Sequence, residues 1–256
     1  MKRFIGDFHV HTLLSPCAEV EMTPNHIVLR AVQNGINLLA VTDHNASGNV
    51  LAALEAGRKY GVTVLPGMEV ECVEEAHIVT IFDTWGQLAQ WQKIVTEARK
   101  SLPPNNANKF GGQFVVDAYD NFICEEKKML LGACRLTARE VIDKSRALGA
   151  LVFAAHIDRP SYSLLGQLGF IGEELTLDAV EISNLNVSEL KEQKFRPLIG
   201  SLPYMTNSDG HNISDFIQGP KNFLEIKEPS VEEIRLALKG ERDRKFKPGY
   251  FVGFNR

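Results

Sequence analysis

The amino-acid sequence predicts an α/β fold built on a mostly parallel sheet. Short apolar runs alternate with amphipathic segments that carry helix start and stop signals, and polar side chains follow several of the runs. The chain has 256 residues, 44% hydrophobic and 23% charged, which suffices for one large domain or two small ones with a sizeable core.

Composition also excludes several classes of protein. No apolar stretch reaches the ~18 residues of a membrane span, and Asp7 and His9 interrupt the N-terminal segment too early for a signal peptide. The formal charge of −4, with both signs interleaved, argues against a protein that coats nucleic acid or anionic membrane. A short oligonucleotide held at a site remains compatible with this charge. Four cysteines without a CxxC pair indicate reduced thiols and a cytoplasmic protein: Cys17, Cys72, Cys124 and Cys134.

The first third of the chain reads as alternating strands and helices. One helix begins at Thr23-Pro24, with Thr23 as its cap, and ends at Gly35; a second covers about Ser47–Tyr60 and is closed by Gly61. The apolar runs predict four strands, at Arg3–Phe8, Ile36–Val41, Val62–Leu65 and His77–Phe82.

The middle of the chain is less regular. Leu88–Ser101 has a helical pattern, the polar sequence PPNNANKFGG predicts an exposed loop, and Gln113–Glu125 predicts a hairpin that turns at Asp120-Asn121. We interpret residues 84–136 as an insertion on a single domain that covers residues 1–256.

Regular alternation resumes after this section. Thr137 and Glu140 form a capping-box pattern at the start of a helix that ends at Gly149, and a second such pattern, Ser230–Glu233, opens the last helix. Three more apolar runs predict strands at Leu151–Ala155, Ala179–Ile182 and Pro203–Thr206.

Polar residues cluster at the ends of these strands. In a closed parallel barrel the carboxyl ends of all strands meet on one face, so residues far apart in sequence converge there. His77 is the exception, because it opens its strand. Imidazole and carboxylate are the ligands of Zn²⁺, Mn²⁺ or Fe²⁺. The set contains six of the seven histidines: His9, His11, His44, Glu69, His77, His156, Asp209 and His211.

Each motif alone has an ordinary structural explanation. His9 and His11 need a twist or bulge to face one site, Asp43-His44 could form a capping turn, and His77 could be a hydrogen-bonded core histidine. Taken together, the set favours a metal site, because a buried cluster of this polarity would cost several kcal/mol without a cation.

The order of the motifs resembles a known family. DFHVHT, TDHN, GMEVE, a following His, AAHIDRP and NSDGH are similar to the PHP (polymerase and histidinol phosphatase) family of metal-dependent phosphoesterases, from about residue 4 to about residue 212. The resemblance implies a distorted (β/α)7 TIM-like barrel, here with an inserted helix-plus-hairpin section, and two or three divalent metal ions (Zn, Mn or Fe).

The resemblance also implies a ligand set. It assigns His9, His11 and Asp209 to one metal, Glu69 as a bridge to a second metal completed by His77 and His156, and His44 and His211 to a third.

The third metal of the family usually takes one more acidic residue or histidine, in a motif like HTxxSDG. Pro16 falls in this stretch and cannot bind a metal. Glu19, Cys17 or Glu21 could substitute, and Glu19 is preferred because a hard oxygen donor suits the expected metals.

The implied activity is hydrolysis of a phosphomonoester or a short nucleotide phosphoester by a metal-activated hydroxide. Arg159 is the basic residue expected to face the phosphate, with a surface ion pair as its alternative. Asp43 would either orient a ligand histidine or donate a proton. Histidinol phosphate, a nucleoside phosphate and the end of a short oligonucleotide all fit this chemistry.

Two other functions are compatible with the motifs. One is a non-catalytic metal-binding PHP module, as in domains attached to bacterial replicative polymerases. The other is an amidohydrolase, a family that usually bridges its metals with a modified lysine, where this chain has Glu69. The insertion would help to select the substrate: its aromatic residues either stack a base or pack a small core of their own, namely Phe110, Phe114, Tyr119 and Phe122.

Overall fold

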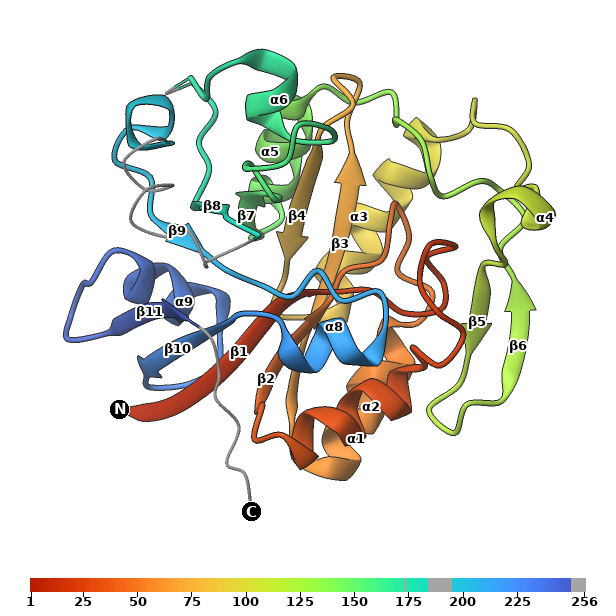
Figure 1. Ribbon diagram of the computed structural model, residues 1–256, viewed down its shortest axis with the longest axis horizontal. Coiled ribbons are helices and arrows are strands. Elements are labelled where there is room, and N and C mark those ends of the chain that lie inside the picture. Colours follow the sequence, from red (N-terminus) through yellow and green to blue (C-terminus); the bar gives the residue numbers. More distant parts are fainter. Residues whose placement is uncertain (173, 184–194, 250–256) are drawn as a thin grey trace.

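The computed structural model describes residues 1–172, 174–183 and 195–249 (Figure 1). Its longer sheet contains β1 (Lys2–Val10), β2 (Leu38–Val41), β3 (Thr63–Glu71), β4 (His77–Ile81), β7 (Leu151–Ala154), β8 (Ala179–Glu181), β9 (Tyr204–Met205), β10 (Lys221–Ile226) and β11 (Lys245–Gly249). These strands lie in the order β11-β10-β1-β2-β3-β4-β7-β8-β9. A separate hairpin contains β5 (Phe114–Val116) and β6 (Phe122–Glu125).

The helices begin largely where the capping residues predicted. They are α1 (Pro24–Gln33), α2 (Val50–Tyr60), α3 (Trp85–Ala98), α4 (Ala107–Phe110), α5 (Ala138–Ala147), α6 (Leu164–Leu168), α8 (Ile213–Gln218) and α9 (Val231–Leu238). Thr23 caps α1, and Thr137 forms the complete capping box of α5. None of the described helices has the length and apolar character needed to cross a membrane.

Two local predictions were wrong. Ser230 does cap α9, but the Glu233 carboxylate accepts from the backbone N–H of Lys227 and from Arg244, so the second capping box is not completed. The loop predicted for PPNNANKFGG contains the short helix α4. In addition, β10, β11, α6 and α8 were not predicted.

The sheet is mixed rather than mostly parallel. Four pairings are parallel (β1–β2, β2–β3, β7–β8 and β8–β9) and four are antiparallel (β3–β4, β4–β7, β1–β10 and β10–β11). Because β4 runs against both of its neighbours, its first residue lies at the edge where β3 and β7 end. This reversal places His77 with the residues that follow the parallel strands.

One face of the sheet forms the inside of a nearly closed barrel. Eight strands, β1 to β4 and β7 to β10, contribute side chains to a single apolar cluster, which includes Phe8, Leu65, Phe153 and Met205. The segment after β9 closes the remaining gap: Gly210 pairs with Val10, and the His11 N–H donates to the Gly210 carbonyl at 3.1 Å. The expected distorted α/β barrel is therefore confirmed.

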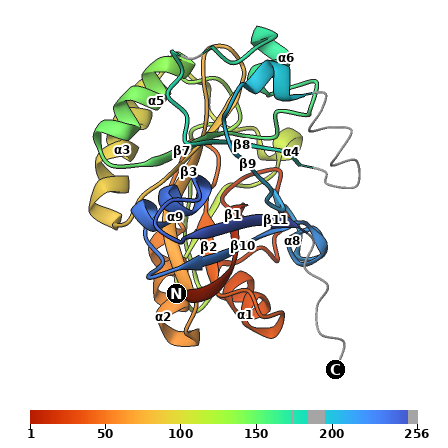
Figure 2. The same cartoon turned by 90° about the vertical axis from the view of Figure 1, so that its left-hand side faces the viewer.

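Helices cover the outer face of the barrel. The outer core contains side chains from α1, α2, α3 and α5, and α3 alone buries Leu88, Trp91 and Val95 in it. Hairpin β5–β6 lies at the side of the molecule away from β10 and β11 (Figure 1). Figure 2 shows β10 and β11 beside the start of β1, with α9 packed next to them.

Candidate metal centre

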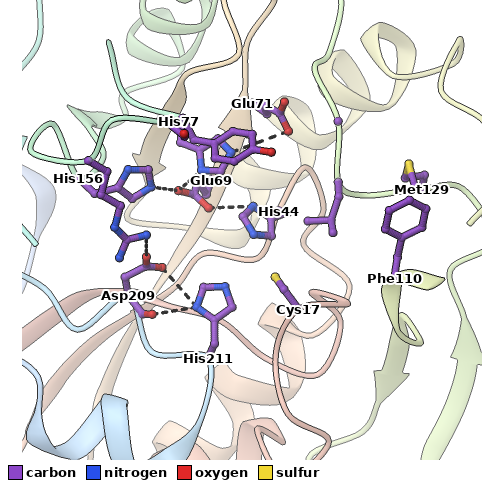
Figure 3. A pocket seen from close by; sticks show the side chains of 15 residues that line it. Cys17, His44, Glu69, Glu71, His77, Phe110, Met129, His156, Asp209 and His211 are labelled. Carbon is purple, nitrogen blue, oxygen red and sulfur yellow. Dashed lines mark hydrogen bonds and ion pairs between the residues drawn. The ribbon is translucent and has the colours of Figure 1, made fainter. Parts of the chain in front are cut away.

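The structure brings all eight polar residues from the strand ends together. Glu69 and His9 lie near the ends of β3 and β1, His77 is the first residue of β4, and the others follow strands around the barrel. They surround or lie beneath a cavity of about 450 Å³, in which Glu69 is central (Figure 3). Residues distant in sequence thus share one edge of the sheet, as expected for a barrel.

A break in the strand register aims His9 and His11 at the same space. The β1–β2 register shifts between Asp7 and Val10, and Val10 packs in the outer core. A bulge of this kind re-aims side chains at the rim of a barrel. The Nε2 atoms of His9 and His11 lie 3.2 Å apart, close enough that only one proton can lie between them.

The other ring nitrogens of these two histidines are held from behind. Nδ1 of His9 lies 2.8 Å from the Glu181 carboxylate, which accepts its proton. Nδ1 of His11 lies 2.9 Å from the Ser15 hydroxyl. That hydroxyl donates to Asp43, so it accepts from His11. Both rings therefore present Nε2 to Glu69 and Asp209, which line the cavity, and this arrangement is typical of metal-binding histidines.

Two carboxylates face the same Nε2 atoms. Glu69 lies 3.1 Å from Nε2 of His9 and 3.4 Å from Nε2 of His11, and Asp209 Oδ1 lies 3.4 and 3.2 Å from them. Carboxylate oxygens and unprotonated ring nitrogens are all acceptors, and this set converges with at most one shared proton. Such a group of acceptors is stabilised by a cation.

Glu69 also contacts the remaining histidines on its other side. Its oxygens lie 2.9 Å from Nδ1 of His44, 2.9 Å from Nδ1 of His77 and 3.3 Å from Nε2 of His156. Both oxygens are buried and have no well-oriented hydrogen bond from the part of the chain that the structure describes. This central position suits a carboxylate that bridges two ions.

The donor set fits divalent metal ions. Among the described residues, three groups have ligand atoms within 4.8 Å of one another, and they share His11 and His44 between them. Two groups combine imidazole nitrogens with a carboxylate oxygen, as Zn²⁺, Mn²⁺ and Fe²⁺ sites do, and the third consists of three imidazoles. The groups are His9–His11–Asp209, His44–Glu69–His77 and His11–His44–His211.

Proton affinities within the cluster follow from its charges. Burial opposes ionisation, yet the surrounding histidines hold the pKa values of Glu69 and Asp209 well below their usual range. Burial also disfavours a charged His9, but Glu181, Glu69 and Asp209 raise its pKa well above the ordinary value. The pKa of His11 is lowered by burial and by its neighbours His211 and His44. The carboxylates that attract a proton to His9 would equally attract a metal ion, so metal uptake would release that proton.

Asp43 lies behind the cluster and does not line the cavity. Its carboxylate accepts from the Thr12 N–H, the Thr12 hydroxyl and the Ser15 hydroxyl, each at 2.7 Å. Burial raises its pKa to about 6, in spite of these hydrogen bonds. Of the two roles predicted for Asp43, these contacts support the orientation of a histidine, here His11 through Ser15.

Arg159 lies at the mouth of the cavity. Its guanidinium is 44% exposed and pairs with Asp209 Oδ2 at 2.7 Å, so its partner is a residue of the cluster and not a surface carboxylate. Tyr162, in the same loop, stacks on the His77 ring with centroids 5.1 Å apart.

Backbone strain is concentrated at this edge of the barrel. His156, Asp209 and Asn45 all have positive φ angles, of 30°, 48° and 50°. His156 is the most unusual of the three, because its φ lies furthest from the left-handed region near +50 to +70°. Residues in such conformations cluster at functional sites.

The structure places Cys17, and not the Glu19 side chain, in the cavity. Glu19 is exposed and contributes only its backbone N–H, which donates to the His211 carbonyl at 2.8 Å. The Cys17 thiol lines the cavity and contacts His211 and His44 (Figure 3). Burial opposes thiolate formation, but hydrogen bonds with these two histidines lower the pKa of Cys17 to about 6.

Sequence reasoning missed several supporting residues. Glu181 ends β8, so the rule that identified the other residues at strand ends could have found it. Lys221 is fully buried, pairs with Asp7 at 3.1 Å and donates to three backbone carbonyls around residues 216–220. Asp7 in turn accepts from the Ser208 N–H, which fixes the segment that carries Asp209. No sequence motif marks this lysine.

The cavity wall is the set of cavity-lining residues from the predicted insertion: Phe110, Met129, Leu131 and Gly132. Of the four aromatic residues singled out in the insertion, Phe110 lines the cavity. Phe114 packs edge-on against Phe122, and Tyr119 is exposed beside Lys59.

Two asparagines attach this section to the barrel. The Asn45 side chain donates to the carbonyls of Leu130 and Gly132, at 2.8 and 3.1 Å. The Asn49 side chain donates to the Phe114 carbonyl and accepts from the Val116 N–H, at 3.0 and 2.9 Å. The cavity wall is thus held in place through main-chain atoms.

The chain is similar in sequence to proteins of several kinds. It is 24% identical over 282 residues to the uncharacterized protein YqxK of Bacillus subtilis, covering 98% of this chain and 65% of that protein. A shorter region, 29% of this chain and 25% of the relative, is 35% identical to a 3′,5′-nucleoside bisphosphate phosphatase of Chromobacterium violaceum. The chain therefore spans about two thirds of the length of YqxK.

Solved structures share the fold at low sequence identity. The lesion-specific endonuclease PfuEndoQ of Pyrococcus furiosus superposes with a TM-score of 0.69 at 22% identity, covering 96% of this chain and 58% of that chain. An amidohydrolase from Chromobacterium violaceum superposes with a TM-score of 0.56 at 18% identity, covering 92% and 96%. At these identities the likeness concerns the fold alone.

A family model decides the relationship. The model described as PHP domain matches residues 7–233, which include every residue of the cluster and nearly the whole barrel. This match agrees with the barrel and with the converging histidines and carboxylates, and the chain belongs to the PHP domain family.

Proposed function

We propose that this protein is a metal-dependent phosphoesterase. The observation that carries the proposal is the convergence of His9, His11, Glu69 and Asp209, whose converging nitrogen and oxygen atoms are acceptors that need a cation. Membership of the PHP domain family supports the same conclusion.

The residues divide into three groups that would hold divalent ions. His9, His11 and Asp209 form the deepest group, and Glu69 lies between it and His77 and His156. His44 and His211 lie toward the opening. When bound, the ions would supply Lewis acidity. They would neutralise charge on the phosphoryl oxygens and lower the pKa of a bound water molecule toward neutral pH.

The protein side chains would position the substrate. Arg159 is the cation at the cavity mouth, and its planar guanidinium suits two oxygens of a phosphate. The cavity wall is apolar and includes the ring of Phe110. It lies opposite the floor, the name used here for the cluster of histidines and carboxylates. This combination fits a phosphoester whose leaving group has a flat, apolar part, such as a nucleoside.

Two features argue against C–N bond hydrolysis. The bridging position is occupied by the Glu69 carboxylate, and no lysine is present among the described residues that line the cavity. An amidohydrolase would be expected to place a modified lysine there, so the phosphoesterase is the better-supported function.

The test combines metal analysis with a substrate panel. Protein purified without chelator or histidine tag should hold two to three equivalents of Zn, Mn or Fe per chain by elemental analysis. It should then release phosphate or nucleotide from at least one of p-nitrophenyl phosphate, a 3′,5′-nucleoside bisphosphate, a dinucleotide and DNA with an abasic site. The last two substrates separate a phosphatase from a nuclease.

His9→Ala should abolish metal binding in the deepest group and hydrolysis while the far-ultraviolet circular dichroism stays unchanged. His26→Ala is the matched control, because His26 lies in α1 outside the cluster. Wild-type turnover in His9→Ala would overturn the proposal. Full metal content without turnover on the whole panel would favour the non-catalytic module.

A further inference from the structure

We propose that Cys17 supplies a thiolate ligand to the outermost metal position, together with His44 and His211. The inference rests on the proposed function, because this ion belongs to the same cluster. It differs from the sequence-based preference for Glu19 and gives the position a soft donor in place of an oxygen.

The geometry of the opening supports this assignment. His44 and His211 belong to one group of ligand atoms with His11, and the rings of His11 and His211 stack with centroids 4.2 Å apart. The Cys17 side chain points into the space between His44 and His211 and contacts both (Figure 3). The buried Glu69 carboxylate faces the same space, 2.9 Å from His44, without a well-oriented hydrogen bond.

The loop that carries Cys17 is built to hold this position. The Ser15 N–H donates to the Thr12 carbonyl and the Ala18 N–H to the Ser15 carbonyl. These bonds form two consecutive tight turns, the second of which has Pro16 and Cys17 at its centre. Gly111 has a φ of 96°, and a side chain there would meet the Pro16 carbonyl at 2.1 Å. The loop is therefore packed from behind by residue 111 and faces the histidines with Cys17.

The identity of the donor determines the metal. Thiolate together with two imidazoles favours Zn²⁺ over Mn²⁺, which prefers oxygen donors. The inner groups, made of imidazole and carboxylate, lack this discrimination. We therefore expect the metal position at the opening to prefer Zn²⁺, and the positions beneath it to discriminate less between Zn²⁺ and Mn²⁺.

Co²⁺ provides the first readout, because a Co²⁺–thiolate bond gives a charge-transfer band that imidazole and carboxylate ligands do not give. Wild-type protein loaded with Co²⁺ should show the band, and Cys17→Ser should lose it together with about one equivalent of metal. Cys124→Ser is the matched control, since Cys124 is exposed on β6 and outside the cavity. It should keep both.

Alkylation by iodoacetamide provides the second readout. Zn²⁺ should slow modification of Cys17 at least about tenfold and leave Cys124 unchanged, as measured by peptide mass spectrometry. A Co²⁺-loaded wild type without the band, or a band that persists in Cys17→Ser, would overturn the inference. If the inference about Cys17 fails but the protein still binds two equivalents of metal and hydrolyses a substrate, the proposed function stands. If the protein neither binds metal nor hydrolyses a substrate, the proposed function fails together with the inference.

Discussion

The floor and the wall of the cavity are built in different ways. On the floor, His9 and His11 are completely buried, and each ring is held from behind by a second polar group, Glu181 or Ser15. The cavity wall is apolar, comes from residues 110–132 and is attached through hydrogen bonds to its main chain. Charged and hydrogen-bonded groups therefore orient the side chains of the floor, whereas the wall provides an apolar surface.

This difference separates two tasks within one cavity. Residues that hold charged ligands must be oriented before binding, and buried hydrogen bonds provide that orientation. Residues that contact an apolar leaving group need only the right surface. Changes to the floor should thus affect stability and metal affinity, whereas changes to the wall should affect the substrate.

The largest effect is expected for Lys221→Met, which leaves the buried Asp7 carboxylate without its ion pair. The free energy of unfolding should fall by roughly 3–5 kcal/mol, because an uncompensated charge stays in the interior. Urea unfolding measures the loss. The double variant Asp7→Asn/Lys221→Met should recover part of it, and a loss below about 1 kcal/mol in Lys221→Met would show that this pair does not support the floor.

An intermediate effect is expected for Glu181→Gln. The charge behind His9 is removed while the side-chain size is kept, so metal affinity should fall about 10- to 100-fold. Competition with a chromophoric chelator measures the affinity. Glu225→Gln is the control, because Glu225 lies on β10 away from the cluster and pairs there with Arg3 and Lys245. Equal metal affinities for Glu181→Gln and wild type would contradict the idea that groups behind the floor support metal binding.

The smallest effect is expected for Phe110→Ala in the cavity wall. KM for a nucleoside phosphate should rise about three- to tenfold, since one aromatic contact is removed, and the metal content should not change. Steady-state kinetics should show no such rise for Tyr119→Ala, because Tyr119 is exposed on the hairpin. A loss of metal in Phe110→Ala would mean that wall and floor are not separate.

Sequence patterns predicted the strands of the barrel well where apolar runs were continuous, as at β2 and β7. They missed the reversal of β4, because strand direction depends on connections and not on periodicity. They also missed β10 and β11. The sequence of β10 includes a lysine, an asparagine and a glutamate beside its apolar residues, and β11 contains two lysines and a proline.

The candidate site was more predictable than its support. Six histidines, Glu69 and Asp209 stand in or next to apolar runs, and the carboxyl ends of the parallel strands share one edge of the barrel, where the reversed β4 places its first residue, His77. Glu181, which contacts His9, ends β8 and was within reach of the same rule, whereas Lys221 works through a tertiary contact to Asp7 that no local motif encodes. The difference between Glu19 and Cys17 depended on the path of one loop, which a spacing of two residues cannot resolve.

The attachment of the wall has one more consequence. Asn45 and Asn49 bind carbonyl and amide groups of the inserted section, and every amino acid except proline offers both groups. The cavity-facing side chains Phe110, Met129 and Leu131 can therefore be exchanged without breaking these hydrogen bonds to the barrel. Asn45 directly follows His44, so the anchor and the outer metal position move as one piece. In evolutionary terms, this chain can change what it recognises one residue at a time while the reacting centre stays as it is.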